Sequence, residues 1–318
     1  MITYSIADLE NLTGIKAHTI RIWEKRYDVI KPSRTSTNIR YYSNDDMRKL
    51  VNIAALLKAG MKISKISKLS QDELNNEITN RLASGSSEDV ITESYISQLI
   101  NAGLEFNEPS FDKLFSSAIL KYGIKDTYIK ILIPVLVRIG LLWTTDKLNP
   151  AQEHFITNLV KQKLHSAIDS LPPADLSQPP VILFLPDFDD HEIGLLMANY
   201  LLRQESRNVI YLGQQVPLVN VKDTVAECKP TQLLFFLIQT RPTDFLQNYI
   251  EQLHSEFRDL DIFLSGNKKL INELSLPDNF HTVFEPEKLV ESMKDNQDAH
   301  RRLAWGLLVG ESHSPDHK

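Results

Sequence analysis

Residues 181–194 read VILFLPDFDDHEIG, and this stretch decides the fold of the second half of the chain. The apolar run at 181–186 suits a buried strand, because a strand covered on both faces needs no alternation of polar side chains. A polar loop with Asp189 and His191 follows, and residues 193–202 have the apolar spacing of a helix. This order predicts the first strand, loop and helix of an α/β domain.

The same rhythm continues to the C-terminal end. Further strand-like runs are VIYLG at 209–213, LLFFLI at 233–238, IFLSG at 262–266 and TVF at 282–284. Helical stretches separate these runs, which predicts a parallel sheet covered on both faces. We therefore expect a doubly wound, Rossmann-like α/β domain at residues 180–309 and a disordered tail at 310–318. Ligands of such sheets bind at the carboxyl ends of the strands, where His191 lies.

Asp189 and His191 form the most informative pair in the chain. An imidazole at the end of a strand, with a carboxylate two residues upstream, is an arrangement in which the ring binds a metal and the carboxylate orients the ring. The alternative is a histidine at a helix N-terminus whose hydrogen bond to Asp189 is purely structural. The pair alone does not decide between these two interpretations.

The first 70 residues predict an all-α winged helix-turn-helix domain. Apolar side chains recur at helical spacing over residues 4–13, 16–27, 43–60 and 61–69. Gly14 breaks the first helix from the second, and the polar stretch at 33–42 suits a wing. Ser43 can cap the next helix, with Asp45 and Asp46 near its positive end.

Charge is distributed unevenly along the chain. Residues 1–70 hold 13 Lys and Arg against 6 Asp and Glu, a balance of +7. The remaining residues hold 22 against 35, a balance of −13, and the whole chain carries −6. A basic block on an acidic protein indicates a polyanionic partner for that block alone, although a solvated charged face would look the same.

The middle of the chain predicts a four-helix bundle at residues 89–172. Its helical segments are expected at 89–104, 109–122, 125–143 and 150–171. The polar stretch at 71–88 resembles a linker, and the proline-rich stretch at 173–180 a second one.

Composition limits the protein class. A single cysteine, Cys228, excludes a disulfide framework and a zinc site built on cysteines. The N-terminal residues lack the pattern of a signal peptide, and Arg138 interrupts the longest apolar run, at 131–143, which is too short to span a bilayer. We expect a cytoplasmic protein without membrane contact. The motifs of a P-loop, a dinucleotide fold, a zinc protease or a nucleophile elbow are absent, so we expect no enzyme.

Residues 4–69 resemble the MerR family of transcription regulators. The resemblance rests on TGIKAHTIRIWEKRY at 13–27, IRYYS at 39–43 and AGMKISKI at 59–66. It implies double-stranded operator DNA as a partner, with the second helix in the major groove. The residues expected at DNA are Lys16, His18, Thr19, Arg21, Arg26, Arg34, Arg40 and Tyr41. Trp23 can equally pack in the core or contact a phosphate.

MerR proteins bind pseudo-palindromic operators as dimers, usually through a long helix after the DNA-binding domain. Here the polar stretch around 70–88 takes that place. The chain is therefore similar to the subgroup that assembles through a C-terminal sensor, and we expect a homo-oligomer, a dimer or a tetramer.

Asp189-x-His191-x-x-Gly194 resembles the signature of cobalamin-binding domains, and Trp143-x9-Glu153-His154 resembles the bundle of the CarH/LitR/CarA type of cobalamin-dependent repressors. The resemblance implies that His191 ligates cobalt while Asp189 accepts its other N–H. Trp143, Glu153 and His154 would then cover the upper face, which favours adenosylcobalamin over methylcobalamin. Gly194 and Gly266 would let the nucleotide tail pass close to the backbone. Without that resemblance, Trp143 is bundle core and Glu153 with His154 an exposed helix start.

Three positions depart from this pattern. Thr144 stands where light-sensing relatives carry a second cobalt-binding histidine, Leu237 replaces a serine near the nucleotide tail, and Ser265 replaces a glycine. The tail is then held differently, or the domain keeps the fold without the cofactor.

Three functional hypotheses follow. The leading one is a transcription regulator, a repressor, whose cobalamin-binding half controls oligomerisation and DNA binding. The alternative is the same architecture without cobalamin, constitutive or controlled by a protein antagonist. The third, a mutase or methyltransferase subunit, requires a catalytic domain for which the chain has no room.

Overall fold

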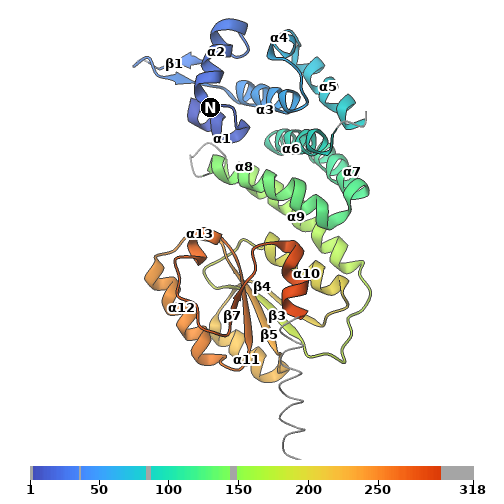
Figure 1. The fold of residues 1–318 in the computed structure, drawn as a ribbon, viewed down its shortest axis with the longest axis vertical. Helices are drawn as coiled ribbons and strands as arrows, with labels where there is room; N and C mark the ends of the chain where they lie inside the picture. The colour runs from blue at the N-terminus through green and yellow to red at the C-terminus, as the bar shows by residue number, and fades with distance from the viewer. Residues whose placement is uncertain (1–2, 36, 84–86, 144–148, 295–318) are drawn as a thin grey trace, which may run out of the picture. The chain divides into compact units, whose positions relative to one another are not determined.

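The structure is a computed structural model that describes residues 3–35, 37–83, 87–143 and 149–294 (Figure 1). The chain forms two compact units that divide between Leu159 and Val160, and each is described by itself. No helix among the described residues is long and apolar enough to cross a membrane.

The first unit begins with a winged helix-turn-helix. Its elements are α1 (Ile6–Thr13), α2 (Ala17–Tyr27), β1 (Ser33–Arg34), β2 (Arg40–Tyr41), α3 (Asn44–Lys58) and α4 (Ile63–Ile66). Ser5 with Asp8, and Ser43 with Asp46, form capping boxes that start α1 and α3. Gly14 ends α1 in the left-handed conformation, and this turn sets α2 at an angle to α1. The antiparallel pair β1–β2 is the predicted wing.

The expectation of a linker at residues 71–88 is wrong for its first part. Helix α5 runs over Gln71–Ala83, and it contacts α3 and α6. Leu74 and Ile78 stand four residues apart, so they share one face of the helix, and both are fully buried. Two apolar residues in a polar stretch are too weak a signal for a helix from sequence, but tertiary packing on them is sufficient.

The expected bundle helices are present. They are α6 (Glu88–Leu104), α7 (Glu108–Thr127), α8 (Ile133–Trp143) and α9 (Pro150–Asp169), with a π-helical turn, η1 (Tyr128–Leu132), before α8. Gly123 has a φ of 75°, which kinks α7 close to the predicted break between the second and third segments. The boundary between the two units falls inside α9.

The second unit is the predicted doubly wound α/β domain. Its parallel strands are β3 (Val181–Pro186), β4 (Val209–Val216), β5 (Gln232–Leu237), β6 (Asp261–Gly266) and β7 (Phe280–Thr282), in the spatial order β4-β3-β5-β6-β7. The intervening elements are α10 (Ile193–Gln204), α11 (Leu218–Cys228), α12 (Thr243–Glu256) and α13 (Lys268–Ile271), and a 3-10 turn, η2 (Pro286–Lys288), follows β7. The last strand lies two residues before the predicted run at 282–284.

The strand order reverses between β3 and β5, the point where sheets of this kind bind ligands. The core of the unit contains Phe184, Phe235 and Leu264, all fully buried. The predicted tail at 310–318 and residues 295–309 of the predicted α/β domain lie outside the described residues.

Candidate functional site

The first candidate surface is α2 with the wing. The side chains predicted to contact DNA are solvent-exposed at Lys16, His18, Arg21, Arg26 and Arg34, and partly exposed at Thr19, Arg40 and Tyr41. Ile20 is fully buried and fixes the opposite face of α2 in the core. This arrangement presents the cations on one accessible surface, as a polyanion requires.

Arg40 has an internal partner that the sequence did not indicate. Its Nε lies 3.3 Å from Glu24 Oε2, close enough for an ion pair but not aligned for a hydrogen bond. The Tyr42 hydroxyl donates a hydrogen bond to the other oxygen of Glu24. Burial, and then the Glu24 carboxylate, raise the pKa of Tyr42. Glu24 thus ties α2 to the wing, and Arg40 is oriented by that tie.

The predicted upper lid is only partly described. The side chain of Trp143 and the whole of Thr144 lie outside the described residues. Glu153 and His154 are neighbours at the start of α9, with His154 Nδ1 2.9 Å from Glu153 Oε2. Their mutual contact leaves both interpretations from the sequence open.

The loop after β3 is organised around the carboxylate of Asp189, which is fully buried. His191 Nδ1 lies 2.9 Å from Asp189 Oδ1, and the His191 backbone N–H donates to the same oxygen. The backbone amides of Ile238 and Gln239, directly after β5, donate to Oδ2 over 2.8 and 3.0 Å. Asp189 therefore orients the imidazole and also joins the two loops at the point where the strand order reverses.

These bonds determine the charge of Asp189. Burial alone would raise the pKa of this carboxyl group. The hydrogen bond with His191 and those from the backbone amides of Gln239, Ile238 and His191 outweigh burial and lower the pKa to about 2. Asp189 is thus ionised at neutral pH, and its Oδ1 accepts a hydrogen bond from the protonated Nδ1 of His191. Half of the His191 side chain remains exposed at the sheet edge.

Three residues of this loop region were missed by sequence reasoning. The Tyr211 hydroxyl donates to Glu192 Oε1 over 2.9 Å, and Lys161 Nζ lies 3.1 Å from Glu192 Oε2. Glu192 thereby links the start of α10 to β4 and to α9. Glu192 stands beside His191 in the motif and could have been suspected, whereas Lys161 and Tyr211 carry no local signal.

Part of the candidate site, the His191–Asp189 pair, fits a corrinoid. A His191 ring held by Asp189, partly exposed at the switch point, fits a lower cobalt ligand. By contrast, the predicted tail positions are closely packed by the protein. A Cβ on Gly194 would lie 2.9 Å from the Phe236 ring, and a Cβ on Gly266, at φ +125°, would lie 2.2 Å from the Leu237 carbonyl oxygen. Both glycines are therefore required by contacts within the protein itself.

Two family models match separate parts of the chain. Residues 4–73 match the MerR HTH family regulatory proteins, and residues 95–166 match the B12 binding domain family. The chain is 26% identical to the HTH-type transcriptional repressor CarH of Myxococcus xanthus over 270 residues, 83% of this chain and 89% of that protein. It is 24% identical to the HTH-type transcriptional repressor CarA of the same organism, over 78% of this chain and 81% of that protein.

A solved structure supports the fold. The monomethylamine corrinoid protein of Methanosarcina barkeri superposes with a TM-score of 0.50 at 16% identity, covering 64% of this chain and 98% of that chain. The chain thus combines a MerR-type helix-turn-helix at residues 4–73 with a helical segment at residues 95–166 that matches the B12 binding domain family, and over most of its length it is similar to the transcriptional repressors CarH and CarA.

Proposed function

We propose that this protein represses transcription by binding operator DNA as a homo-oligomer whose assembly is controlled by a cobalamin in its C-terminal half. The observation that carries the proposal is the Asp189–His191 pair at the switch point of the sheet, in a chain that also presents a MerR-type cationic surface. The names of two relatives as transcriptional repressors support repression as the sign of regulation.

In this proposal the chain's own residues bind and orient the cofactor. With Nδ1 turned to Asp189, Nε2 of His191 is the ring nitrogen that would ligate cobalt. When bound, the corrinoid would supply a cobalt ion that an imidazole can ligate. Glu153 and His154 offer a carboxylate and an imidazole that can hydrogen-bond an adenosyl group, which makes adenosylcobalamin the proposed form.

Control of assembly requires that the cofactor bind one arrangement of the subunits more tightly than the others. The number of subunits proposed is two or four, because paired DNA-binding domains fit a pseudo-palindromic operator. A protein antagonist would act in the same scheme if it bound the subunits and prevented their assembly.

The first test is a visible absorption spectrum of the purified protein after incubation with adenosylcobalamin in the dark and desalting, with methylcobalamin in parallel. We expect a retained corrinoid spectrum that is lost in His191→Ala. His281→Ala is the matched control, because His281 also contacts a carboxylate, Asp261, but at the opposite end of the same sheet. Retention in His191→Ala would disprove ligation by this histidine.

A second candidate function has its own observation in its favour. The Phe236 ring packs against Gly194 and Leu237 is fully buried, so protein side chains occupy the region expected to hold the nucleotide tail. This favours a regulator of the same architecture that works without cobalamin, under a protein antagonist or constitutively. A protein that stays colourless with both cobalamins but still binds DNA would establish this second candidate.

A further inference from the structure

The DNA-binding domain packs directly on the helical bundle in the first unit. Helix α3 contacts α6, and α1 contacts α8. In Figure 1, α1 and α3 lie between the bundle helices and the elements expected to reach DNA, which are α2 and the β1–β2 wing. The cations of α2 and the wing therefore remain exposed while the domain is docked.

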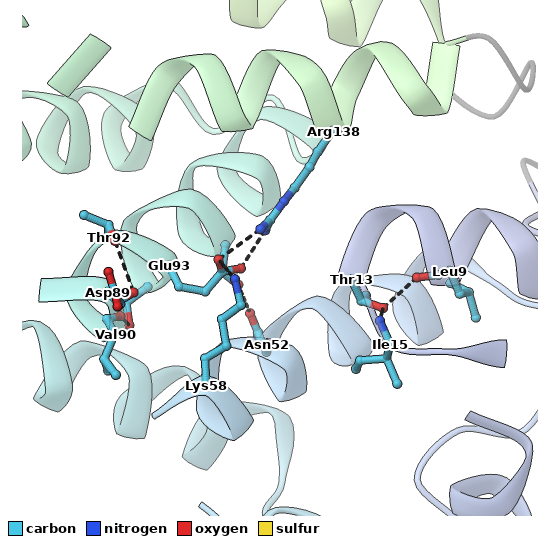
Figure 2. A network of polar contacts seen from close by, with 12 residues as sticks. Leu9, Thr13, Ile15, Asn52, Lys58, Asp89, Val90, Thr92, Glu93 and Arg138 are labelled. Carbon is cyan, nitrogen blue, oxygen red and sulfur yellow. Dashed lines mark hydrogen bonds and ion pairs between the residues drawn. The ribbon is translucent and has the colours of Figure 1, made fainter. Parts of the chain in front are cut away.

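A buried carboxylate joins three elements of this interface. Glu93 of α6 has a side chain that is only 5% exposed. Its two carboxylate oxygens accept hydrogen bonds from the two terminal nitrogens of Arg138 on α8, over 2.6 and 2.9 Å. Lys58, the last residue of α3, lies 2.7 Å from Glu93 Oε2 (Figure 2). One side chain thus holds the DNA-binding domain and α8 at the same point.

The charges in this cluster match. Burial alone would raise the pKa of Glu93, but the hydrogen bonds and positive charges of Arg138 and then Lys58 outweigh it and lower the pKa. The carboxylate is therefore ionised at neutral pH and paired with cations from two other helices. The Arg138 fork is the more directional of the two pairs, because a guanidinium meets a carboxylate through two parallel bonds.

A second polar cluster lies in the same interface. Asn52 of α3 is almost fully buried, and its Nδ2 donates to Asn75 of α5 over 2.8 Å. Its Oδ1 accepts from Ser97 over 3.1 Å and from Asn101 over 2.8 Å, both on α6. These bonds are directional, so they specify one register of α3 on α6 rather than adding much net stability.

The polar part of this interface is suited to opening and closing. Separating two apolar faces exposes hydrocarbon to water, whereas separating ion pairs and carboxamides lets water replace each lost bond. Contacts between domains of one chain are commonly of this more polar kind, and motion across them is the usual expectation. The polar contacts thus specify one docked geometry, and the DNA-binding domain can still separate from the bundle.

From these observations we propose that the ion pairs of Glu93 with Arg138 and Lys58 act as a lock, which holds the DNA-binding domain docked on the bundle. The docked state in turn sets how the DNA-binding domains of an oligomer are presented to an operator. The position of Arg138 on α8 couples the lock to the helix that ends at Trp143. Any ligand that moves α8 away from Glu93 thereby releases the DNA-binding domain, and operator binding favours the docked state in return. This inference rests on the proposed role as an oligomeric DNA-binding regulator.

The test uses the full-length chain and two DNA probes. One is a duplex selected by this protein from a random-sequence pool, and the other is the same duplex with one half-site scrambled. In Glu93→Gln we expect affinity for the intact duplex to fall about 5- to 150-fold, the usual range of coupling between sites. Affinity for the single half-site should stay within about twofold, because one domain on one half-site needs no fixed orientation.

Hydrogen exchange read by mass spectrometry reports the docking itself. We expect faster exchange in α1, α3 and α6 of Glu93→Gln, and unchanged exchange in the strands of the α/β domain. Glu105→Gln is the matched control, because Glu105 pairs with Arg48 of α3 from the solvent-exposed end of α6 and should change neither readout. Arg138→Gln should reproduce Glu93→Gln, and the double variant should be no worse than either single one.

The inference fails if exchange at α3 and α6 is unchanged in Glu93→Gln, or if exchange rises while both duplex affinities stay at the wild-type value. It also fails if both affinities drop equally, since Glu93 would then merely support the fold of the DNA-binding domain. A wild-type chain that selects no duplex at all would instead overturn the proposed regulatory function, an outcome that the variants do not produce.

Discussion

Each unit of this protein has a buried carboxylate that joins separate elements, and the two carboxylates are held by different kinds of donor. Asp189 in the α/β domain accepts hydrogen bonds from three backbone amides and from the adjacent His191. Glu93 in the first unit is held by the tips of two long cationic side chains from other helices. The first carboxylate is bound mostly by groups that cannot move without moving the chain, and the second by groups that can swing away.

This difference indicates different duties. Backbone donors hold the Asp189 loop rigidly, as a site that positions a ligand atom must be held. Side-chain donors from separate helices fix a geometry that can be abandoned when the partners separate, which suits an interface that transmits a signal. The following four predictions test this contrast, beginning with the largest expected effect.

Replacing Asp189 with Ala should cost the α/β domain about 3 kcal/mol, because two backbone amides after β5 lose their acceptor and His191 loses its orienting bond. Hydrogen exchange in β3 and β5 measures the loss as a lower opening free energy. Asp190→Ala is the matched control, since Asp190 is exposed beside it. Equal losses in both variants would contradict the assignment of a structural centre to Asp189.

Acid should weaken the same region through the same carboxylate. The pKa of Asp189 falls from an ordinary 3.8 to about 2 on folding, so its ionised form contributes about 2 kcal/mol above pH 4. That contribution is lost as the pH falls from about 4 toward 2, because the depressed carboxyl group is then protonated in the folded state as well. Urea unfolding over this range should bring wild type and Asp189→Asn progressively together. A constant gap would show that ionisation of Asp189 does not stabilise the fold.

At the other carboxylate, Arg138→Lys should cost about 1–2 kcal/mol. The substitution keeps the charge beside Glu93 but removes one of the two parallel bonds, in a place where the Arg138 side chain is only 18% exposed. The opening free energy of α6 and α8 from hydrogen exchange measures the loss. An unchanged value would mean that charge alone, and not the geometry of the fork, holds α8 to α6.

The smallest effect is expected at Lys58→Ala, below about 1 kcal/mol. The Lys58 side chain is 54% exposed, and water can replace much of its interaction with Glu93. The opening free energy of α3 is the quantity to compare, at low and at high salt. A loss larger than that of Arg138→Lys would reverse the order of the two partners within the lock.

The sequence was most informative where a pattern is local. Continuous apolar runs separated by helices predicted the doubly wound sheet, and Ser43 with Asp46 marked the start of α3. The Asp189–His191 contact was also predictable, because the two residues stand two positions apart in one short loop.

The sequence was least informative where the partner is distant in the chain. Lys58 and Arg138 lie 35 and 45 residues from Glu93, and nothing in their neighbourhoods predicts a common cluster. The same holds for Lys161 and Tyr211 around Glu192, and for the internal tie between Arg40 and Glu24. Such pairs depend on how helices pack, which no local pattern reports.

Helix α5 has a practical consequence for hybrid regulators. Exchanging DNA-binding domains between relatives at residue 70, where the polar stretch begins, would separate α3 from α5, whose Leu74 and Ile78 are buried and which contacts α3. It would also leave Asn52 without Asn75. A transplanted domain should therefore bring its own α5, so that the unit of exchange in this chain is longer than the winged helix by one helix.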